Sequence, residues 1–263
     1  MVSGLLGGCP LTDQFIDNNS KFEFAHRLAL ISDEIYENAK RSCEGNYVNV
    51  DPENSECLAA VDDMKKCVKD VSPSNVVKPK CDFLSPHCQD QNRRELVADA
   101  SEFLLSPSVA PNSWCSAIQL THSDIWGNDE GIREALHIRE GTVPHWQRCN
   151  RSVSYTQDVS SVVSVHKELS KLSLEVLVQS GDHDPSITYM GTLKWIRSLN
   201  LTMMEDWRPW YVDDQVAGFI RKYSEDGHHL TFATVKGAGH PAPEYLRKEC
   251  YLMFGRWIHY QAI

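Results

Sequence analysis

The chain has 263 residues, and its 41% of hydrophobic residues is enough for a substantial core in one large domain or two smaller ones. Its 26 lysines and arginines stand against 36 aspartates and glutamates without a dense basic run, which argues against a nucleic-acid or anionic-membrane partner. No apolar stretch approaches the ~20 residues of a spanning helix. Residues 1–13 lack the charged start and long apolar stretch of a signal peptide, so none is predicted in this chain.

The N-terminal part of the chain predicts one strand and then several helices. Residues 4–13 are expected to form a short strand that runs into a loop broken by Pro10. Ser20 and Glu23 form a capping box, and apolar residues then recur at helical spacing, so the pattern predicts one amphipathic helix that ends near Ser42. Further helices are expected over residues 56–71, 93–105 and 128–138, with an irregular, proline-containing loop over residues 72–90.

The C-terminal part of the chain alternates between strands and helices. Strands are expected over residues 173–180, 210–223 and 230–236, and helices over residues 188–199 and 243–260. Such alternation predicts an α/β fold, with a parallel or mixed sheet and flanking helices. Three parts follow from this: residues 1–13 as a strand of the sheet, residues 14–125 as a helical cap or insertion, and residues 126–263 as the remainder of the core.

Nine cysteines indicate an oxidising compartment. Six of them lie in a loop-rich region without C-x-x-C spacing, which favours a disulfide framework over a zinc site. These six are Cys43, Cys57, Cys67, Cys81, Cys88 and Cys115. The odd total leaves at least one thiol without a partner in the chain. Cys9 and Cys250 can each be a buried small apolar residue or a member of a bridge.

Three N-x-S/T triplets, at Asn18, Asn150 and Asn200, are candidate glycosylation sites. Such triplets also arise by chance. Together with the cysteines, they suggest a protein of the secretory pathway.

Two strand ends carry the residues on which a functional hypothesis depends. The apolar run of LEVLVQSGDHD (174–184) predicts a buried strand that delivers Asp184 into a loop, and LTFATVKGAGH (230–240) ends in a glycine-rich turn and His240. Open α/β sheets keep their active sites at such strand ends. An aspartate followed along the chain by a histidine matches the last two members of the Ser, Asp, His order of α/β-hydrolases. Taken alone, the two residues are weak evidence, and a solvated acidic turn with an incidental histidine is the favoured interpretation.

Other candidate sites are weaker. The pairs His228-His229 and Asp182-His183 lack the spacing of metal ligands, and neither a metal nor another cofactor is predicted. The tryptophans of the C-terminal part are interpreted as core or cap packing rather than as a platform for stacking sugars. They are Trp195, Trp207, Trp210 and Trp257.

From Asp13 onward the chain resembles the C-terminal part of the plant serine carboxypeptidase-like proteins, a group of α/β-hydrolases that includes peptidases and acyltransferases using glucose esters. The matching stretches are FAHRLALISDEIYENAKRSCEGNYVNVDP (24–52), WGNDEGIREALHIREGT (126–142), SGDHD (180–184), GTLKWIRSLNLT (191–202), EDWRPWYVDDQVAGFIRKY (205–223), LTFATVKGAGH (230–240) and APEY (242–245). By this resemblance, Asp184 is the family's catalytic aspartate and His240 its catalytic histidine. The DWRPW stretch is more similar to the acyltransferase-containing branch than to the general carboxypeptidases.

The resemblance also implies what the 263 residues lack. The family's nucleophile lies in a G-x-S-x-G-type turn upstream of the region that matches residues 4–13, and no such pentapeptide occurs here. Ser180 lies inside the strand that carries the aspartate and cannot replace it. The glycine-rich loop that donates oxyanion-hole N–H groups belongs to the same upstream region. We therefore expect an N-terminally truncated form, inactive on its own because removal of a triad serine lowers turnover by roughly 10⁶. The alternative is a non-catalytic remnant or an interaction module.

Further expectations rest on the same resemblance. The family's bridges imply a Cys43–Cys57 disulfide, a second one within residues 43–115, and a third that would join Cys149 to a missing N-terminal segment or chain. The substrate of a complete member would be a small ester or a peptide, and its location secreted or vacuolar. Pro185 and Pro241 directly follow the two candidate residues, where the family has other residues. Because proline restricts the residue before it, both side chains are expected to be slightly displaced.

Overall fold

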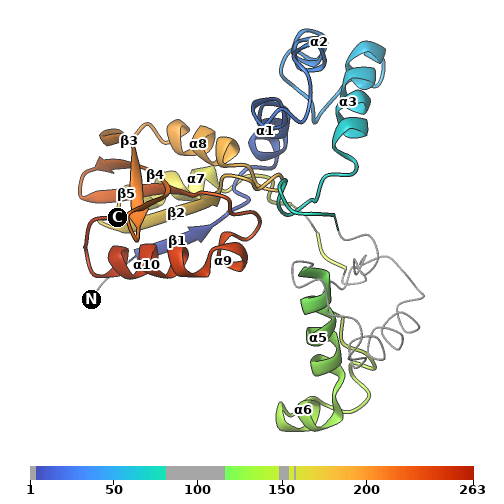
Figure 1. Cartoon of the computed structure of the whole chain (residues 1–263), viewed down its shortest axis with the longest axis vertical. Coiled ribbons are helices and arrows are strands. Elements are labelled where there is room, and N and C mark those ends of the chain that lie inside the picture. The colour runs from blue at the N-terminus through green and yellow to red at the C-terminus, as the bar shows by residue number, and fades with distance from the viewer. Residues whose placement is uncertain (1–3, 81–115, 148–153, 157) are drawn as a thin grey trace. The chain divides into compact units, whose positions relative to one another are not determined.

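A computed structural model of the chain describes residues 4–80, 116–147, 154–156 and 158–263 (Figure 1). The helix predicted over residues 93–105 lies outside the described residues. The chain divides into two compact units, one formed by residues 1–77 with 158–263 and the other by residues 78–157. The sheet and both candidate strand ends belong to the first unit. The division of the chain after residues 13 and 125 stays a prediction.

A mixed five-stranded sheet forms the centre of the first unit. Its strands are β1 (Gly4–Gly8), β2 (Glu175–Gly181), β3 (Thr202–Val212), β4 (Gln215–Glu225) and β5 (His228–Val235), in the spatial order β1-β2-β5-β4-β3. Strands β1, β2 and β5 run parallel, and β4 and β3 continue the sheet in antiparallel pairs. The predicted α/β class is confirmed. Because three neighbouring strands are parallel, the residues that follow them lie at one edge of the sheet.

Helices accompany the sheet and form most of the remaining described structure. The first unit contains α1 (Gln14–Arg27), α2 (Asp33–Cys43), α3 (Ser55–Val68), α7 (Val163–Leu169), α8 (Tyr189–Ser198), α9 (Ala242–Tyr245) and α10 (Arg247–Ile258). The second unit contains α5 (Ser116–Asn128) and α6 (Glu130–Ala135). Among the described helices, none combines the length and the apolar character that crossing a membrane requires.

Helices cover both faces of the sheet. Val176 and Val178 of β2 belong to a buried cluster with α8, whereas Leu177 between them belongs to a cluster that includes Met253 of α10. Figure 1 shows α8 on one side of the strands and α10 on the other. Successive side chains of a strand point to opposite faces, so the apolar run of β2 fills two cores at once. Burial on both faces holds the end of β2 in a fixed place.

The first three helices form a smaller cluster in the same unit. Phe22 of α1 packs with residues of α2 and α3, and a disulfide joins Cys43 to Cys57 between the latter two helices. This confirms the expected bridge. Helix α1 also packs on α8, where the Ser20 and Thr188 hydroxyls lie 2.6 Å apart.

The single helix predicted from Ser20 to about Ser42 is wrong. Helix α1 begins earlier, because the Asp13 side chain accepts a hydrogen bond from the Ile16 N–H and caps the helix. The chain then leaves the helix at Ala29, whose φ is 55°, and the hydroxyl of Ser32 caps α2. Ser20 lies inside α1 rather than at its start.

The single strand predicted over residues 210–223 is also wrong. This segment forms a hairpin of β3 and β4, with Asp213 and Asp214 at its turn. Both aspartates have positive φ, 49° and 59°, as the central residues of a type I′ turn require. Aspartate tolerates this conformation better than most residues. The two strands therefore reverse direction within two residues.

Other boundaries differ less from the predicted ones. The helix predicted over residues 243–260 is divided into α9 and α10 around Leu246, and the helix predicted over residues 128–138 is shortened to α6 and preceded by α5. Trp195 and Trp210 are fully buried, as core packing requires. Trp207 is half-exposed and stacks on Phe219.

Candidate functional site

Asp184 follows β2 and is fully buried, with 0% of its surface exposed. Its Oδ1 accepts hydrogen bonds from the backbone N–H groups of Ser186, at 2.8 Å, and Ile187, at 3.0 Å. These two bonds fix the carboxylate in its loop and leave Oδ2 for another partner. The N–H that Pro185 lacks is not needed in this arrangement.

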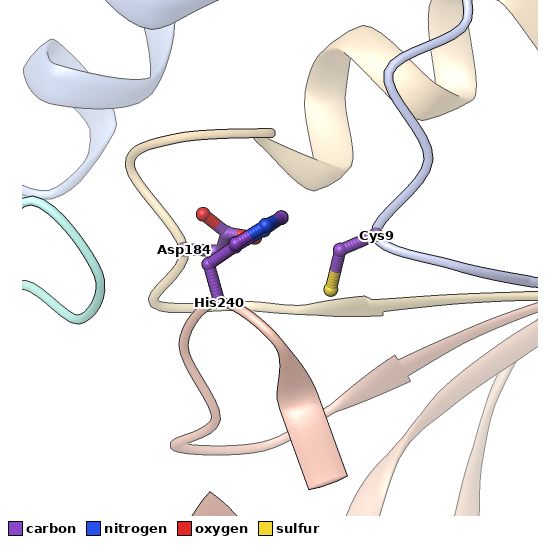
Figure 2. Close-up of side chains that lie close together, drawn as sticks. All are labelled: Cys9, Asp184 and His240. Atoms are coloured by element: carbon purple, nitrogen blue, oxygen red, sulfur yellow. The ribbon is translucent and has the colours of Figure 1, made fainter. Parts of the chain in front are cut away.

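His240 follows β5 and supplies that partner. Its Nδ1 lies 2.8 Å from Oδ2 of Asp184 (Figure 2). The histidine is also held by its own backbone, because its N–H donates to the carbonyl of Ser74 at 2.6 Å. Asp184 and His240 thus meet although Pro185 and Pro241 follow them, and the slight displacement expected from the prolines stays a prediction. The structure brings together the two residues that the strand ends predicted, and 37% of the His240 side chain remains exposed.

The environment of His240 favours its charged form. Hydrogen bonding to Asp184, with a smaller contribution from Cys9, raises the pKa of His240 to about 10, although partial burial opposes the shift. The imidazole therefore carries a proton at neutral pH and forms an ion pair with a buried carboxylate. Because Nδ1 is engaged by Asp184, Nε2 is the ring nitrogen that can exchange a proton with another group.

Two glycines allow close backbone approaches around the site. A Cβ on Gly181 would lie 2.3 Å from the carbonyl oxygen of Ala238, and a Cβ on Gly239 would lie 2.0 Å from the carbonyl oxygen of Ser74. Neither distance is compatible with a side chain. Gly181 thus lets the loop after β2 approach the loop before His240, and Gly239 lets that second loop approach Ser74.

A third loop, residues 72–77, frames the site and was not predicted to do so. Asn75 is fully buried, and its side-chain amide donates to the carbonyl of Gly237 in the loop before His240. Ser186 donates through its hydroxyl to the carbonyl of Pro73 in the same segment. These bonds join segments more than 100 positions apart, so no local pattern in the sequence could have revealed them.

Cys9 is a third side chain at this place. It follows β1, is 3% exposed and is a free thiol. Ligand atoms of Cys9, Asp184 and His240 all lie within 4.8 Å of one another, and Figure 2 shows the thiol beside the histidine ring. Of the two interpretations that the sequence left open for Cys9, the buried, unbridged residue is the one observed. Its position beside the histidine was not foreseen.

The three side chains offer sulfur, oxygen and nitrogen atoms of the types that bind Zn²⁺. A proton between Asp184 and His240 already satisfies both groups at 2.8 Å, so their geometry is explained without a cation. Three of the four residues considered earlier as metal ligands have other side-chain contacts. His183 contacts Asp182 at 2.6 Å, and His228 contacts the carbonyl of Leu172.

The remaining candidates are distributed over the chain. Cys67 is an exposed free thiol, and Cys81, Cys88, Cys115 and Cys149 lie outside the described residues. Asn200 is exposed just before β3, whereas the amide of Asn18 lies within α1 and donates to the carbonyl of Gln14. Asn150 lies outside the described residues.

Comparison with known proteins gives a consistent result. A family model described as serine carboxypeptidase matches residues 2–260. The chain is 42% identical over 262 residues to serine carboxypeptidase-like 17 of Arabidopsis thaliana and 38% identical to serine carboxypeptidase-like 7 of the same plant. Each match covers 100% of this chain and 53% of the relative, so the chain spans about half the length of these curated relatives.

A solved structure supports the fold. The crystal structure of Kex1(delta)p, a prohormone-processing carboxypeptidase from Saccharomyces cerevisiae, matches with a TM-score of 0.55 and 18% sequence identity. The match covers 94% of this chain and 52% of the yeast chain. The mixed sheet and its flanking helices thus correspond to part of a carboxypeptidase fold.

Proposed function

The chain belongs to the serine carboxypeptidase family, and we propose that Asp184 and His240 form the carboxylate and imidazole half of an acyl-transfer site. The observation that supports this proposal is the 2.8 Å contact between a fully buried carboxylate and a partly exposed histidine at the ends of parallel strands. A buried carboxylate fixes the orientation and tautomer of the ring, and the exposed side of the ring can meet a substrate.

The proposed roles follow from which atoms are free. Asp184 holds Nδ1 of His240, so Nε2 takes the proton of a nucleophile and returns it to the leaving group. Asp184 orients the ring and stabilises the imidazolium that results. Because hydrogen bonding raises the pKa of His240, the neutral form that can accept a proton from a hydroxyl becomes more abundant as the pH rises.

The 263 residues contain no G-x-S-x-G pentapeptide. A serine nucleophile of the family's kind, and the N–H groups of its oxyanion hole, would have to come from a segment outside this sequence. With such a segment, we expect an acyl-enzyme that forms from an ester or from a C-terminal peptide bond. Acyl transfer from a sugar ester is the preferred reaction because of the DWRPW stretch at residues 206–210, and peptide hydrolysis is the second candidate.

A secreted or vacuolar location is part of the same proposal. The Cys43–Cys57 disulfide supports an oxidising compartment, since such bonds persist there and are rare in the cytosol. The exposed Asn200 is then a site for N-linked glycosylation.

A fluorophosphonate probe tests the proposed role of the site, since it reacts with an activated serine. We expect no labelling of the purified 263-residue chain and labelling of a serine once the N-terminal half of a serine carboxypeptidase-like relative is added or fused. His240→Gln and Asp184→Asn should abolish that labelling. The matched controls His259→Gln and Asp158→Asn change exposed residues of the same types away from the site and should not affect it.

The alternative is a non-catalytic remnant or interaction module. It predicts no labelling under any of these conditions, even when circular dichroism shows that both segments are folded. Labelling that persists in His240→Gln and Asp184→Asn would also contradict the proposed roles.

A further inference from the structure

Cys9 occupies a position in the sheet that is equivalent to those of Asp184 and His240. Each of the three residues follows one of three neighbouring parallel strands, β1, β2 and β5. Their order along the chain is cysteine, aspartate, histidine. This is the order in which α/β-hydrolases place nucleophile, acid and base. The family's serine would lie upstream of residues 4–13, so Cys9 is a different residue, but its thiol lies at the same edge of the sheet as the acid and the base.

The backbone conformation of Cys9 is also like that of a nucleophile in this class of fold. Its φ is 45°, a left-handed conformation that non-glycine residues adopt rarely, and it lies between β1 and α1. A strained residue between a strand and a helix is the geometry that exposes the nucleophile of α/β-hydrolases. The backbone N–H of Cys9 donates to the carbonyl of Gln179 at 2.7 Å, which ties this turn to β2.

From the cluster of Cys9, His240 and Asp184 we propose that Cys9 is a thiol nucleophile, activated by His240, that accepts an acyl group from an activated ester. The supporting distance is the 4.8 Å within which the three ligand atoms lie. A histidine held by a carboxylate stabilises a thiolate by keeping the proton that the thiol releases. This inference rests on the proposed function only for the role of His240 in proton transfer. It adds Cys9 as an acceptor of the acyl group within the 263 residues.

The step balances as an acyl transfer without oxidation. The thiolate attacks the carbonyl carbon of the ester, a sulfur–carbon bond forms, and the bond from carbon to the leaving oxygen breaks. The leaving oxygen takes the proton that His240 holds. The products are a thioester on Cys9 and a free alcohol or phenol.

Other titratable groups surround this pair. Cys250 of α10 faces Cys9, and burial raises its pKa to about 12, so its thiol keeps its proton near neutral pH. Tyr245 of α9 faces Asp184, and burial raises the pKa of its phenol above the ordinary value. Lys21 of α1 also interacts with Asp184, and burial lowers the pKa of its ammonium group. Among these neighbours, His240 is the one that lies within 4.8 Å of the Cys9 thiol together with Asp184, and Cys9 contributes to its raised pKa.

Access to Cys9 limits the size of the acyl donor. The thiol is 3% exposed, whereas 37% of the His240 side chain is open to solvent. A small ester that approaches over the histidine ring is therefore the expected substrate class. p-Nitrophenyl acetate meets this requirement, because it carries the smallest common acyl group and a good leaving group.

The test is acetylation of the folded 263-residue chain by p-nitrophenyl acetate, followed by peptide mapping. We expect an acetyl group on the tryptic peptide that ends at Lys21 and contains Cys9, removable by neutral hydroxylamine as a thioester is. The internal controls are Cys250, a buried thiol whose pKa burial raises, and Cys67, which is exposed. Cys250 should stay unmodified, and Cys67 should react more slowly than Cys9 at pH values near 6.5.

Two variants separate activation by the histidine from simple access. His240→Gln should lower the acetylation rate of Cys9 about 100-fold, the typical contribution of a positioned proton donor or acceptor, and leave that of Cys67 unchanged. Asp184→Asn should also lower the acetylation rate of Cys9, although this variant keeps both the Cys9 thiol and the His240 ring. Circular dichroism of each variant establishes that the fold is kept.

Two results would overturn the proposal. One is a Cys9 that is acetylated only in denaturant, and the other is a rate that is the same in wild type and both folded variants. Neither result would affect the fluorophosphonate experiment with the added N-terminal half. Failure of that experiment, in turn, would leave acetylation of Cys9 measurable. The two proposals can therefore fail separately.

Discussion

The α-carbon of Gly181, at the end of β2, lies against the backbone carbonyl of Ala238 in the loop after β5, so that a Cβ on the glycine would be 2.3 Å from that oxygen. This contact sets the distance between the two loops that carry Asp184 and His240. A single methyl group at Gly181 should therefore disturb both stability and the site.

Gly181→Ala is expected to lower the free energy of unfolding by about 1–3 kcal/mol, the usual cost of overpacking. Chemical denaturation followed by circular dichroism measures this change. The control is Gly255→Ala in α10, where a Cβ would have no heavy atom within 4 Å. Because alanine is the better helix former, the control should be neutral or up to about 1 kcal/mol more stable. Equal changes in the free energy of unfolding for the two substitutions would contradict the close approach of Gly181 to Ala238.

Asn75→Ala should destabilise the first unit by about 1–3 kcal/mol, because it removes two hydrogen bonds of a fully buried side chain. The amide of Asn75 donates to the carbonyl of Gly237, and its oxygen accepts from the N–H of Val77. Thermal melting compares this variant with Asn49→Ala, in which the side chain is exposed. A loss of less than about 0.5 kcal/mol in Asn75→Ala would mean that the loop at residues 72–77 does not fix the site.

The raised pKa of His240 makes stability depend on pH. Its pKa is about 10 in the folded chain, against an ordinary value of 6.5 for an unperturbed histidine, so protonation stabilises the fold. This stabilisation is fully present below pH 6.5 and is lost as the pH rises through about 10. Denaturation at several pH values measures the free energy of unfolding. Its value for wild type should exceed that of His240→Gln most near pH 6, and the difference should shrink toward pH 10. A difference independent of pH would contradict the ion pair.

Glycosylation should discriminate between two of the predicted asparagines. Asn200 is exposed in a turn, with a φ of 58°, whereas the amide of Asn18 lies in α1 and is bonded to the carbonyl of Gln14. Expression in a secretory host followed by glycosidase digestion and peptide mapping should find a glycan on Asn200 and none on Asn18. Asn200→Gln should remove the corresponding mass shift. A glycan on Asn18 and none on Asn200 would contradict the prediction that exposure of the asparagine decides which site is glycosylated.

The strand ends could be predicted because their signals are local. A short apolar run that closes in glycine and is followed by a polar residue indicates a buried strand that ends at a loop, and both β2 and β5 have this form. Parallel pairing of these strands then brings Asp184 and His240 to one edge. Predicting that Asp184 and His240 meet therefore required no knowledge of the loops between the strands.

Other features could not be predicted, because they depend on contacts between distant segments or on turns with weak signals. The turn at Asp213 and Asp214 lacks the glycine that usually marks a type I′ hairpin, so the sequence pattern merges β3 and β4 into one strand. Asn75 makes its hydrogen bond to the chain 162 positions later. Cys9 meets His240 only through the parallel order of β1, β2 and β5. None of these contacts leaves a periodic pattern in the sequence.

The central claim is that a proton joins Nδ1 of His240 to the buried carboxylate of Asp184. Nuclear magnetic resonance of the chain with ¹⁵N-labelled histidine tests it most directly. The account predicts a ring N–H proton far downfield of the backbone amides, absent in Asp184→Asn, and a ring that titrates near pH 10 rather than 6.5. A His240 ring that titrates near its ordinary pKa of 6.5, unchanged in Asp184→Asn, would contradict it.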